Sequence, residues 1–203
     1  MSPRRLTLAA ALTAAAVALL AGCASPAGQG GADVQTIRVG AVTSPMTDIV
    51  DAAADEIEDG YEIKLVEVAD YVTINKMLAA GDIDANFSQH KPYMEEFNAA
   101  NGADLTAVQP IYNFTIAFYS KTLDDIADLP QGATVAIPND ASNTGRALKM
   151  LADAKIITLA EGVDPYAATV DDIAENPKDL QFLELQINQL NTAYDEADLV
   201  FQW

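Results

Sequence analysis

The sequence Asp84-Ala-Asn-Phe-Ser-Gln-His-Lys-Pro-Tyr93 marks a point where a strand ends and a helix begins. Residues 82–87 have the pattern of a short strand. Pro92 suits the first turn of a helix because it has no backbone N–H to donate. Apolar residues then recur at helical spacing. This stretch therefore predicts a strand-to-helix junction of an α/β fold.

The side chains at this junction are aromatic or polar. His90 is the only histidine of the chain, and Phe87 and Tyr93 lie within three residues of it. Ligands of open α/β sheets bind at the carboxyl ends of the strands. The three residues are therefore candidates for a binding site. The alternative interpretation is that His90 helps to cap a helix while Phe87 packs in the core.

The same alternation continues on both sides of the junction. Upstream, we expect strands at 37–42 and 61–69 and helices at 48–57 and 71–80, and we expect the helix after the junction to cover 91–100. The long apolar stretch at 105–120 predicts two strands joined by a bend, where the chain enters a second lobe. Beyond it we expect a helix at Asp124-Asp125, strands at 133–138, 180–185 and 199–201, helices at 144–154 and 187–196, an extended piece at 156–159, and a turn or short helix at 170–175. Strand–helix alternation at this spacing predicts parallel sheets with crossovers.

The N-terminus has the features of an export signal. Arg4 and Arg5 precede an apolar run at 6–20, which is short for a membrane span but long enough for a signal peptide. Leu20-Ala-Gly-Cys23 resembles a lipobox, the signal for cleavage before a cysteine that is then acylated with fatty acids such as palmitate. We expect a signal peptide at 1–22, followed by the acylated Cys23 and a Gly-rich tether at 23–35. The alternative is an ordinary signal peptide with an incidental cysteine.

The composition bounds the function. Half of the residues are apolar and the net charge is −19, which indicates a globular protein and argues against nucleic acid or an anionic membrane surface as a partner. A single cysteine allows no disulfide within the chain. One histidine and one cysteine give no zinc cluster, and no serine elbow or Gly-rich phosphate loop is present. We expect no metal, no cofactor and no catalytic residue, although an acid–base pair among the many carboxylates stays open.

A second informative stretch is Ile137-Pro-Asn-Asp-Ala-Ser-Asn-Thr-Gly-Arg146. A strand ends at Pro138, and we expect a helix to begin near Asn143, a preferred N-cap residue type. Free N–H groups and the helix dipole would make this end an anion site. Arg146 would lie in the first turn, where it could bind a carboxylate in a bidentate way. The alternative is a surface arginine paired with a nearby acid.

Taken together, these stretches resemble the NlpA-type lipoproteins, the methionine-binding components of ABC importers. The resemblance runs from residue 37 to residue 198. It rests on Asp70-Tyr-Val72 with Asn75, Gly81-Asp-Ile-Asp-Ala-Asn86, Gln89-His-Lys-Pro-Tyr93, Tyr119-Ser-Lys121, Ala136-Ile-Pro-Asn-Asp140, Asn143-x-x-Arg-Ala-Leu148, Asp172-Ile and Glu175-Asn-Pro177. It implies a two-lobed periplasmic-binding fold of type II, with the first lobe at 36–115, the second at 116–203, and a ligand clamped between them.

The resemblance also implies site residues and partners. In the first lobe these residues are Tyr71, Phe87, His90 and Tyr93, and in the second lobe Asn139, Asn143 and Arg146. Arg146 would hold the ligand carboxylate, and the aromatic residues would surround the ligand side chain. A protein of this kind is not an enzyme. It is anchored to the outer face of the cell membrane and passes its ligand to an ABC permease that works with an ATPase.

The sequence departs from the family pattern at four places: Ser44–Asp48, Ser88, 186–192 and 201–203. The ligand is therefore left open between methionine, a related amino acid and a short peptide. The chain also stops directly after an apolar strand, from which we expect a C-terminal truncation that removes the return to the first lobe. Two other functions remain as alternatives: an enzyme on the same fold with His90 as its base, and a surface antigen with a vestigial pocket.

Overall fold

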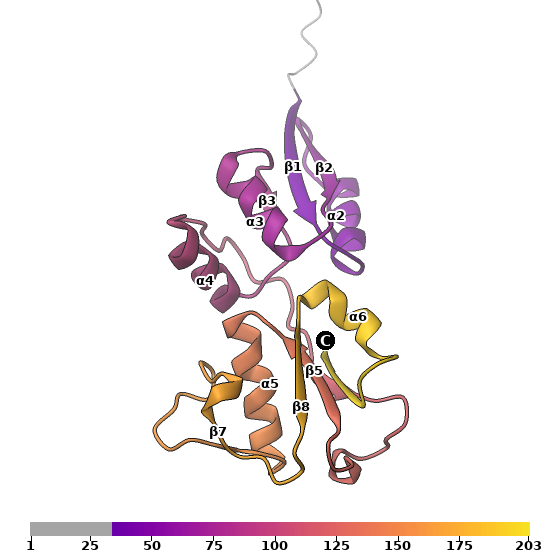
Figure 1. Ribbon diagram of the computed structural model, residues 1–203. Coiled ribbons are helices and arrows are strands. Elements are labelled where there is room, and N and C mark those ends of the chain that lie inside the picture. Colours follow the sequence, from indigo (N-terminus) through magenta and orange to yellow (C-terminus); the bar gives the residue numbers. More distant parts are fainter. Residues whose placement is uncertain (1–33) are drawn as a thin grey trace, which may run out of the picture.

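Residues 34–203 are described in the computed structural model, and they form two α/β lobes (Figure 1). We call residues 35–115 the first lobe and residues 116–203 the second lobe, because each contains its own larger sheet. The predicted signal peptide, Cys23 and the tether up to residue 33 lie outside the described residues.

The first lobe contains a three-stranded sheet in the order β2-β1-β3, and both pairs are parallel. Its strands are β1 (Gln35–Ala41), β2 (Tyr61–Glu67) and β3 (Ala85–Asn86). Its helices are α2 (Met46–Asp55), α3 (Tyr71–Ala80) and α4 (Lys91–Asn101). The predicted parallel sheet with helical crossovers is confirmed here.

Helix α3 has a clear signal at each end. The Asp70 carboxylate accepts hydrogen bonds from the N–H groups of Val72 and Thr73, which have no partner inside the helix. Gly81 ends the helix in the left-handed conformation, with φ of 79°, which glycine adopts without a steric cost. These two caps fix the start of α3 and therefore the position of Tyr71, its first residue.

The second lobe contains a four-stranded sheet in the order β4-β9-β5-β8. Strand β5 is parallel to β8 and β9, and β4 pairs antiparallel with β9. Its strands are β4 (Ala117–Tyr119), β5 (Thr134–Pro138), β8 (Gln181–Leu185) and β9 (Leu199–Gln202), and β6 (Thr158–Leu159) pairs separately with β7 (Ile173–Glu175). Its helices are α5 (Ala141–Asp153) and α6 (Leu190–Ala193), with 3-10 turns η2 (Ile126–Asp128), η3 (Val170–Asp172) and η4 (Ile187–Gln189).

The largest apolar core lies between α5 and the second sheet. Leu148 and Leu151 on α5 are fully buried, as are Val135 and Ile137 on β5 and Phe201 on β9. Close packing of this core also requires a glycine in α5. A Cβ at Gly145 would lie 2.3 Å from the carbonyl oxygen of Tyr166, so any side chain there would displace the loop that covers the helix.

Several sequence predictions need correction. Residues 105–116 form no strand, and their apolar side chains gain little from burial, since Val108 is 94% and Ile111 57% exposed. The strand expected at 82–87 is reduced to the two residues of β3. The helix expected at Asp124-Asp125 is the 3-10 turn η2, in which Asp125 is the N-cap. The helix expected at 187–196 is the 3-10 turn η4 followed by the single turn of α6.

The start of α5 also differs from the prediction. The helix begins at Ala141, not near residue 144, because the Asp140 side chain accepts a hydrogen bond from the Asn143 N–H at 3.0 Å. Asp140 is therefore the N-cap. Arg146 consequently lies in the second turn of α5, beyond the first turn in which the helix dipole acts most strongly.

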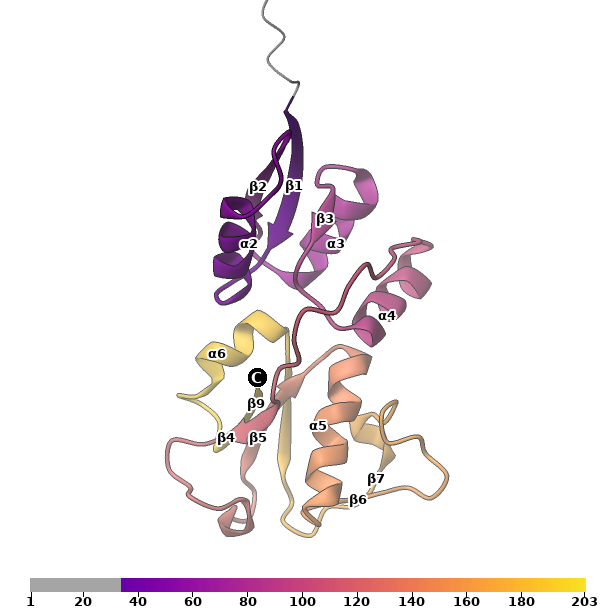
Figure 2. The ribbon, with the colours of Figure 1, turned by 180° about the vertical axis from the view of Figure 1, so that it is seen from behind.

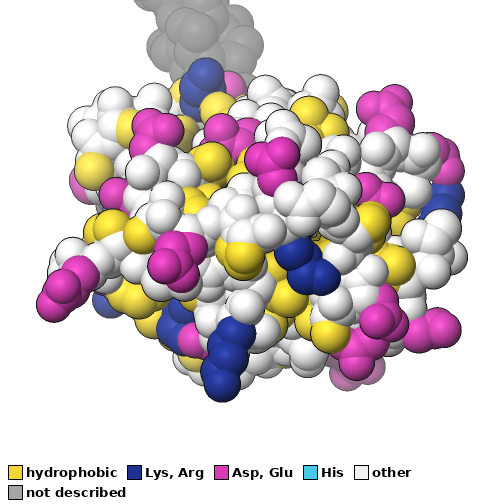
Figure 3. All heavy atoms as spheres, turned by 60° about the horizontal axis from the view of Figure 1, so that its bottom comes forward, with side chains coloured by type: hydrophobic (Ala, Val, Ile, Leu, Met, Phe, Trp, Pro, Cys, Tyr) yellow, Lys and Arg dark blue, Asp and Glu magenta, His cyan; other side chains and the backbone are white. Residues whose placement is uncertain are grey.

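Acidic side chains are scattered over the face of the molecule shown in Figure 3, and they do not gather in one patch. Among residues 34–203, no helix is long and apolar enough to cross a membrane.

Candidate ligand-binding cleft

The two lobes face each other across a cleft. Figures 1 and 2 show α4 of the first lobe beside the N-terminal end of α5, and α6 of the second lobe facing α2. The predicted site residues come from the loop before α4, from the first turns of α3 and α4, and from the loop before α5 and its first two turns.

A buried cluster of amide side chains holds the loop between β3 and α4. Asn75 on α3 is fully buried and forms two hydrogen bonds of 2.7 Å with the Gln89 amide, one in each direction. Asn86 donates a third hydrogen bond to the Asn75 oxygen at 2.8 Å. Because these bonds join α3 to both ends of the loop, the cluster fixes the backbone that carries Ser88 and His90.

His90 is the N-cap residue of α4, but its side chain makes no capping hydrogen bond. The alternative interpretation of His90 as a capping side chain is therefore wrong. Its ring stacks on Tyr93 with centroids 6.4 Å apart, and its Nε2 atom is buried without a partner. The pKa of His90 is lowered to about 4, first by burial and then by the positive charge of Arg146, while Glu96 acts in the opposite direction. His90 is consequently neutral at physiological pH.

Tyr93 lies among several acidic groups. Its pKa is raised above the usual value for tyrosine, first by burial and then by the negative charges of Asp140, Glu96 and Asp70. The hydroxyl therefore stays protonated and can donate a hydrogen bond. Since Asp140 belongs to the second lobe, Tyr93 lies where the two lobes meet.

The N-terminus of α5 is already occupied by an acidic side chain. The Glu96 carboxylate of α4 accepts hydrogen bonds from the N–H groups of Ala141, at 3.3 Å, and Ser142, at 3.1 Å. We predicted that this helix end would bind an external anion. In the structure Glu96 is that anion, and it also links the two lobes.

Arg146 remains available for an anion. Its guanidinium is partly buried and donates one hydrogen bond, to Asn143 Oδ1 at 2.9 Å. Within residues 34–203, no carboxylate lies within salt-bridge distance of it, so the alternative of a surface pair is wrong. Burial lowers the pKa of Arg146, although Asp140 opposes that shift. We call Arg146, Asn143 and His90, whose pKa the charge of Arg146 lowers, the charged end of the cleft.

Two further predicted residues lie at the margin of this region. Phe87 packs edge-to-face on Tyr112, with ring centroids 5.5 Å apart, and it contacts the apolar cluster that contains Tyr71. The interpretation of Phe87 as a packing residue therefore describes most of its contacts. The Asn139 side chain is exposed, and its backbone N–H donates to the Leu185 carbonyl at 2.9 Å.

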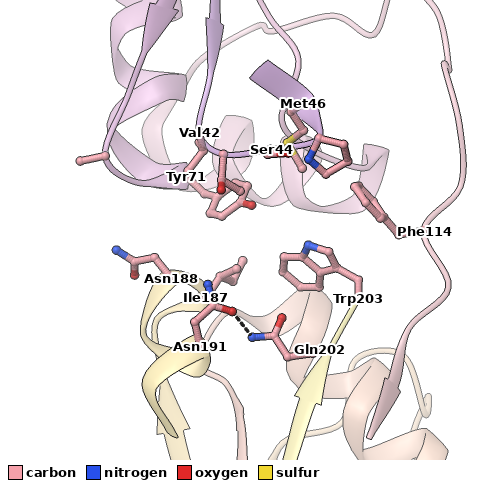
Figure 4. A pocket seen from close by; sticks show the side chains of 13 residues that line it. Val42, Ser44, Met46, Tyr71, Phe114, Ile187, Asn188, Asn191, Gln202 and Trp203 are labelled. Atoms are coloured by element: carbon pink, nitrogen blue, oxygen red, sulfur yellow. Dashed lines mark hydrogen bonds between the residues drawn. The ribbon is translucent and has the colours of Figure 1, made fainter. Parts of the chain in front are cut away.

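A cavity of about 350 Å³ is lined on one side by Tyr71 (Figure 4). It is enclosed by residues of the turn before α2, by η4 and α6, and by the end of β9. The residues around it are Val42, Thr43, Ser44, Pro45, Met46, Ala69, Tyr71, Phe114, Ile187, Asn188, Asn191, Gln202 and Trp203. We call this space the neutral cavity, and among the predicted site residues only Tyr71 lines it.

Sequence reasoning missed most of the neutral cavity. Its walls include Ser44–Met46, Asn191 and Gln202, which fall in stretches that we noted only as departures from the family pattern. The available signal was the position of Gln202 at the end of a strand, where ligand-binding residues of α/β folds gather. The partners of Gln202 could not be inferred, because they come from a helix of one turn.

The fold and the cavity define a two-lobed α/β protein with a candidate binding site between its lobes. Residues 37–202 match the model of the NlpA lipoprotein family, and the chain belongs to this family. A relative from Vibrio cholerae, described as a probable D-methionine-binding lipoprotein MetQ, is 38% identical over 196 residues. That match covers 96% of this chain and 70% of the relative.

Solved structures show the same similarity. Lipoprotein Tp32 from Treponema pallidum superimposes with a TM-score of 0.78 at 34% identity, covering 83% of this chain and 70% of that chain. A periplasmic substrate-binding protein of an ABC transporter from Coxiella burnetii gives a TM-score of 0.76 at 33% identity, covering 81% of this chain and 70% of that one. The resemblance drawn from the sequence motifs is therefore confirmed at the level of family and fold.

Proposed function

We propose that this protein is a substrate-binding lipoprotein that holds an amino acid or a short peptide between its lobes for delivery to an ABC importer. Family membership supports the lipoprotein class. The names of the Vibrio cholerae and Coxiella burnetii relatives support an amino-acid ligand and an ABC transporter, respectively. The partners would be the permease and ATPase subunits of that transporter.

The observation that carries the proposal is the state of Arg146. A partly buried guanidinium without a carboxylate partner is costly unless a ligand supplies the anion. Its remaining N–H groups suit bidentate binding of a carboxylate. His90 and Tyr93 would face the bound group from the first lobe, Asn139 and Asn143 would flank Arg146, and Tyr71 and Phe87 would form the aromatic wall.

Calorimetric titration of the full chain with the twenty amino acids and with short methionine peptides tests this proposal. We expect saturable binding of at least one of these ligands at one site per chain. If none of them binds, the proposed function is wrong.

The proposal also includes a lipid anchor on Cys23, which would hold the protein on the non-cytoplasmic face of the cell membrane. The motivation is the Leu20–Cys23 lipobox together with the family description as a lipoprotein. Replacing Cys23→Ser should prevent acylation, and the protein should then be found unprocessed or released from the membrane. A mature, cleaved Cys23→Ser protein that stays bound to the membrane would contradict the anchor.

A further inference from the structure

The neutral cavity contains recognition groups that the charged end of the cleft does not use. On the first-lobe side, Ser44 in the turn before α2 and Met46, the first residue of α2, line the cavity. Figure 4 shows Asn191, Gln202 and Trp203 of the second lobe on its other side. Its volume of about 350 Å³ falls within the usual range of small-molecule sites, roughly 300–1,000 Å³. It is therefore large enough to hold part of a ligand.

The side chains around the cavity are uncharged, although the chain carries a net charge of −19. All 13 described residues around it are apolar or neutral polar. The one titratable side chain in this set is Tyr71, whose pKa burial raises to about 12, so its hydroxyl keeps its proton at neutral pH. A charged group in this space would lose its hydration without gaining a counter-charge, which is unfavourable. The cavity therefore suits a neutral group.

Two amide side chains on the second-lobe side form a matched pair. Gln202, only 9% exposed, donates a hydrogen bond from Nε2 to Asn191 Oδ1 at 2.7 Å. Among residues 34–203 the NH₂ group of Asn191 and the side-chain oxygen of Gln202 form no other hydrogen bond, and Figure 4 shows the pair below Tyr71. If the oxygen and nitrogen of both amides were exchanged, Asn191 would donate the hydrogen bond to Gln202. The pair would then still offer a ligand one donor and one acceptor.

We propose that the neutral cavity binds an amide group of the ligand. An amide presents one N–H and one C=O, which complement the free acceptor of Gln202 and the free donor of Asn191. The indole of Trp203 and the side chain of Met46 provide apolar surface for the carbon atoms beside that amide. This inference rests on the proposed function, because it assumes that the ligand is an amino acid or a short peptide.

The amide can come from two sources, namely the side chain of an amino acid such as glutamine or the peptide bond of a dipeptide. Methionine has a thioether in place of a side-chain amide, and a thioether is only a weak hydrogen-bond acceptor. A methionine side chain in this cavity would leave the polar atoms of Asn191 and Gln202 without new partners. The inferred preference is therefore for an amide-containing ligand over free methionine.

Trp203 provides a direct readout, because it is the only tryptophan of the chain and it lines the cavity. Glutamine, alanyl-alanine and methionine are titrated into the full chain while tryptophan fluorescence and heat are recorded. We expect at least one amide-containing probe to change the fluorescence and to bind roughly tenfold more tightly than methionine, which corresponds to one or two net hydrogen bonds. Which of the two probes binds identifies the source of the amide.

Variants locate the effect. Gln202→Met removes the amide at nearly constant volume and should weaken binding of the preferred probe by roughly 2- to 12-fold. Asn191→Asp, at an exposed position, adds a negative charge beside the cavity without touching the core and should weaken the same probe. Gln181→Met, on the exposed surface of β8, is the matched control and should change nothing.

The inference is overturned if methionine binds as tightly as both amide-containing probes, or if Gln202→Met and Asn191→Asp leave the preferred probe unaffected. The proposed function survives either result, provided that the wild-type chain binds an amino acid or peptide. If none of the three probes binds, the inference is also overturned, and the titration with the twenty amino acids then decides the proposed function separately.

Discussion

The two ends of the cleft offer a ligand different kinds of interaction. At the charged end, the charge of Arg146 lowers the pKa of His90, while Glu96 and Asp140 oppose the pKa shifts of His90 and Arg146, respectively. In the neutral cavity, Asn191 and Gln202 present hydrogen-bonding groups without any formal charge. The charged end can provide affinity through one strong contact, whereas the neutral cavity can discriminate between ligands of equal charge. Tyr71 lines the cavity and lies close enough to Tyr93 to affect its titration, so it joins the two regions.

The largest effect should come from the charged end. Arg146→Ala would leave the ligand carboxylate buried and unpaired, and we expect binding to weaken by about 2–5 kcal/mol. Arg146→Lys should recover only part of the loss, because an ammonium group cannot form the bidentate contact. Calorimetric titration of both variants with the best wild-type ligand measures the effect. Lys64→Ala, which removes an exposed cation of the first lobe, controls for the change in net charge. Unchanged ligand binding by Arg146→Ala would show that Arg146 does not hold the ligand carboxylate, and the contrast between the two ends of the cleft would then fail.

The next effect concerns the support of the first-lobe loop. Asn75→Ala would leave the amides of Gln89 and Asn86 without their shared partner in a buried position. We expect the free energy of unfolding to fall by about 1–3 kcal/mol and ligand binding to weaken, because the loop that carries His90 is released. Urea unfolding and calorimetry measure the two consequences. Asn101→Ala, which removes an exposed amide at the end of α4, should cause neither change.

A smaller effect is expected at the contact between α4 and α5. Glu96→Ala removes the acceptor for the N–H groups of Ala141 and Ser142, which should cost about 0.5–2 kcal/mol of stability. Hydrogen exchange at these two amides should become faster. Glu95→Ala is the matched control, because Glu95 is exposed and pairs with Lys91 on the same helix. Exchange that is equally slow in the Glu96 variant would show that the contact does not hold the lobes together.

The smallest effect is the pH dependence that His90 contributes. Its pKa is about 4 in the folded state and near 6.5 in the unfolded state, so the unfolded state binds more protons between these values. The contribution of His90 to the free energy of unfolding is therefore fully present above about pH 6.5, and it is lost as the pH falls towards 4. Since the ring is partly exposed, we expect about 1 kcal/mol or less. The pH profile of His90→Gln should be flatter than that of wild type over this interval, and identical profiles would contradict the assignment.

Local patterns predicted most of the fold. The helix at 71–80, the alternation of strands and helices, and the buried run of β5 are all encoded by residues close together in sequence. The prediction failed at 105–116, where apolar residues such as Val108 and Ile111 stay exposed and no strand forms. It also failed at the N-terminus of α5, because Asp140 and Asn143 are both good capping residues and only the structure decides between them.

The part of the site that could be predicted consists of residue types that are rare in this chain. His90 and Arg146 stood out because histidine and arginine are scarce in this acidic chain. Glu96 and Gln202 did not stand out, because their importance comes from partners 45 or more and 11 residues away, respectively. A long-range contact between common polar residues leaves no local pattern. This is why the neutral cavity emerged only from the structure.

The most direct test of the central claim is a crystal structure of the full chain with its best ligand. We expect the ligand carboxylate to accept two hydrogen bonds from the Arg146 guanidinium, while Glu96 keeps its contacts with the N–H groups of Ala141 and Ser142. A carboxylate seated on those N–H groups in place of Glu96, or a ligand bound outside the cleft, would contradict the account.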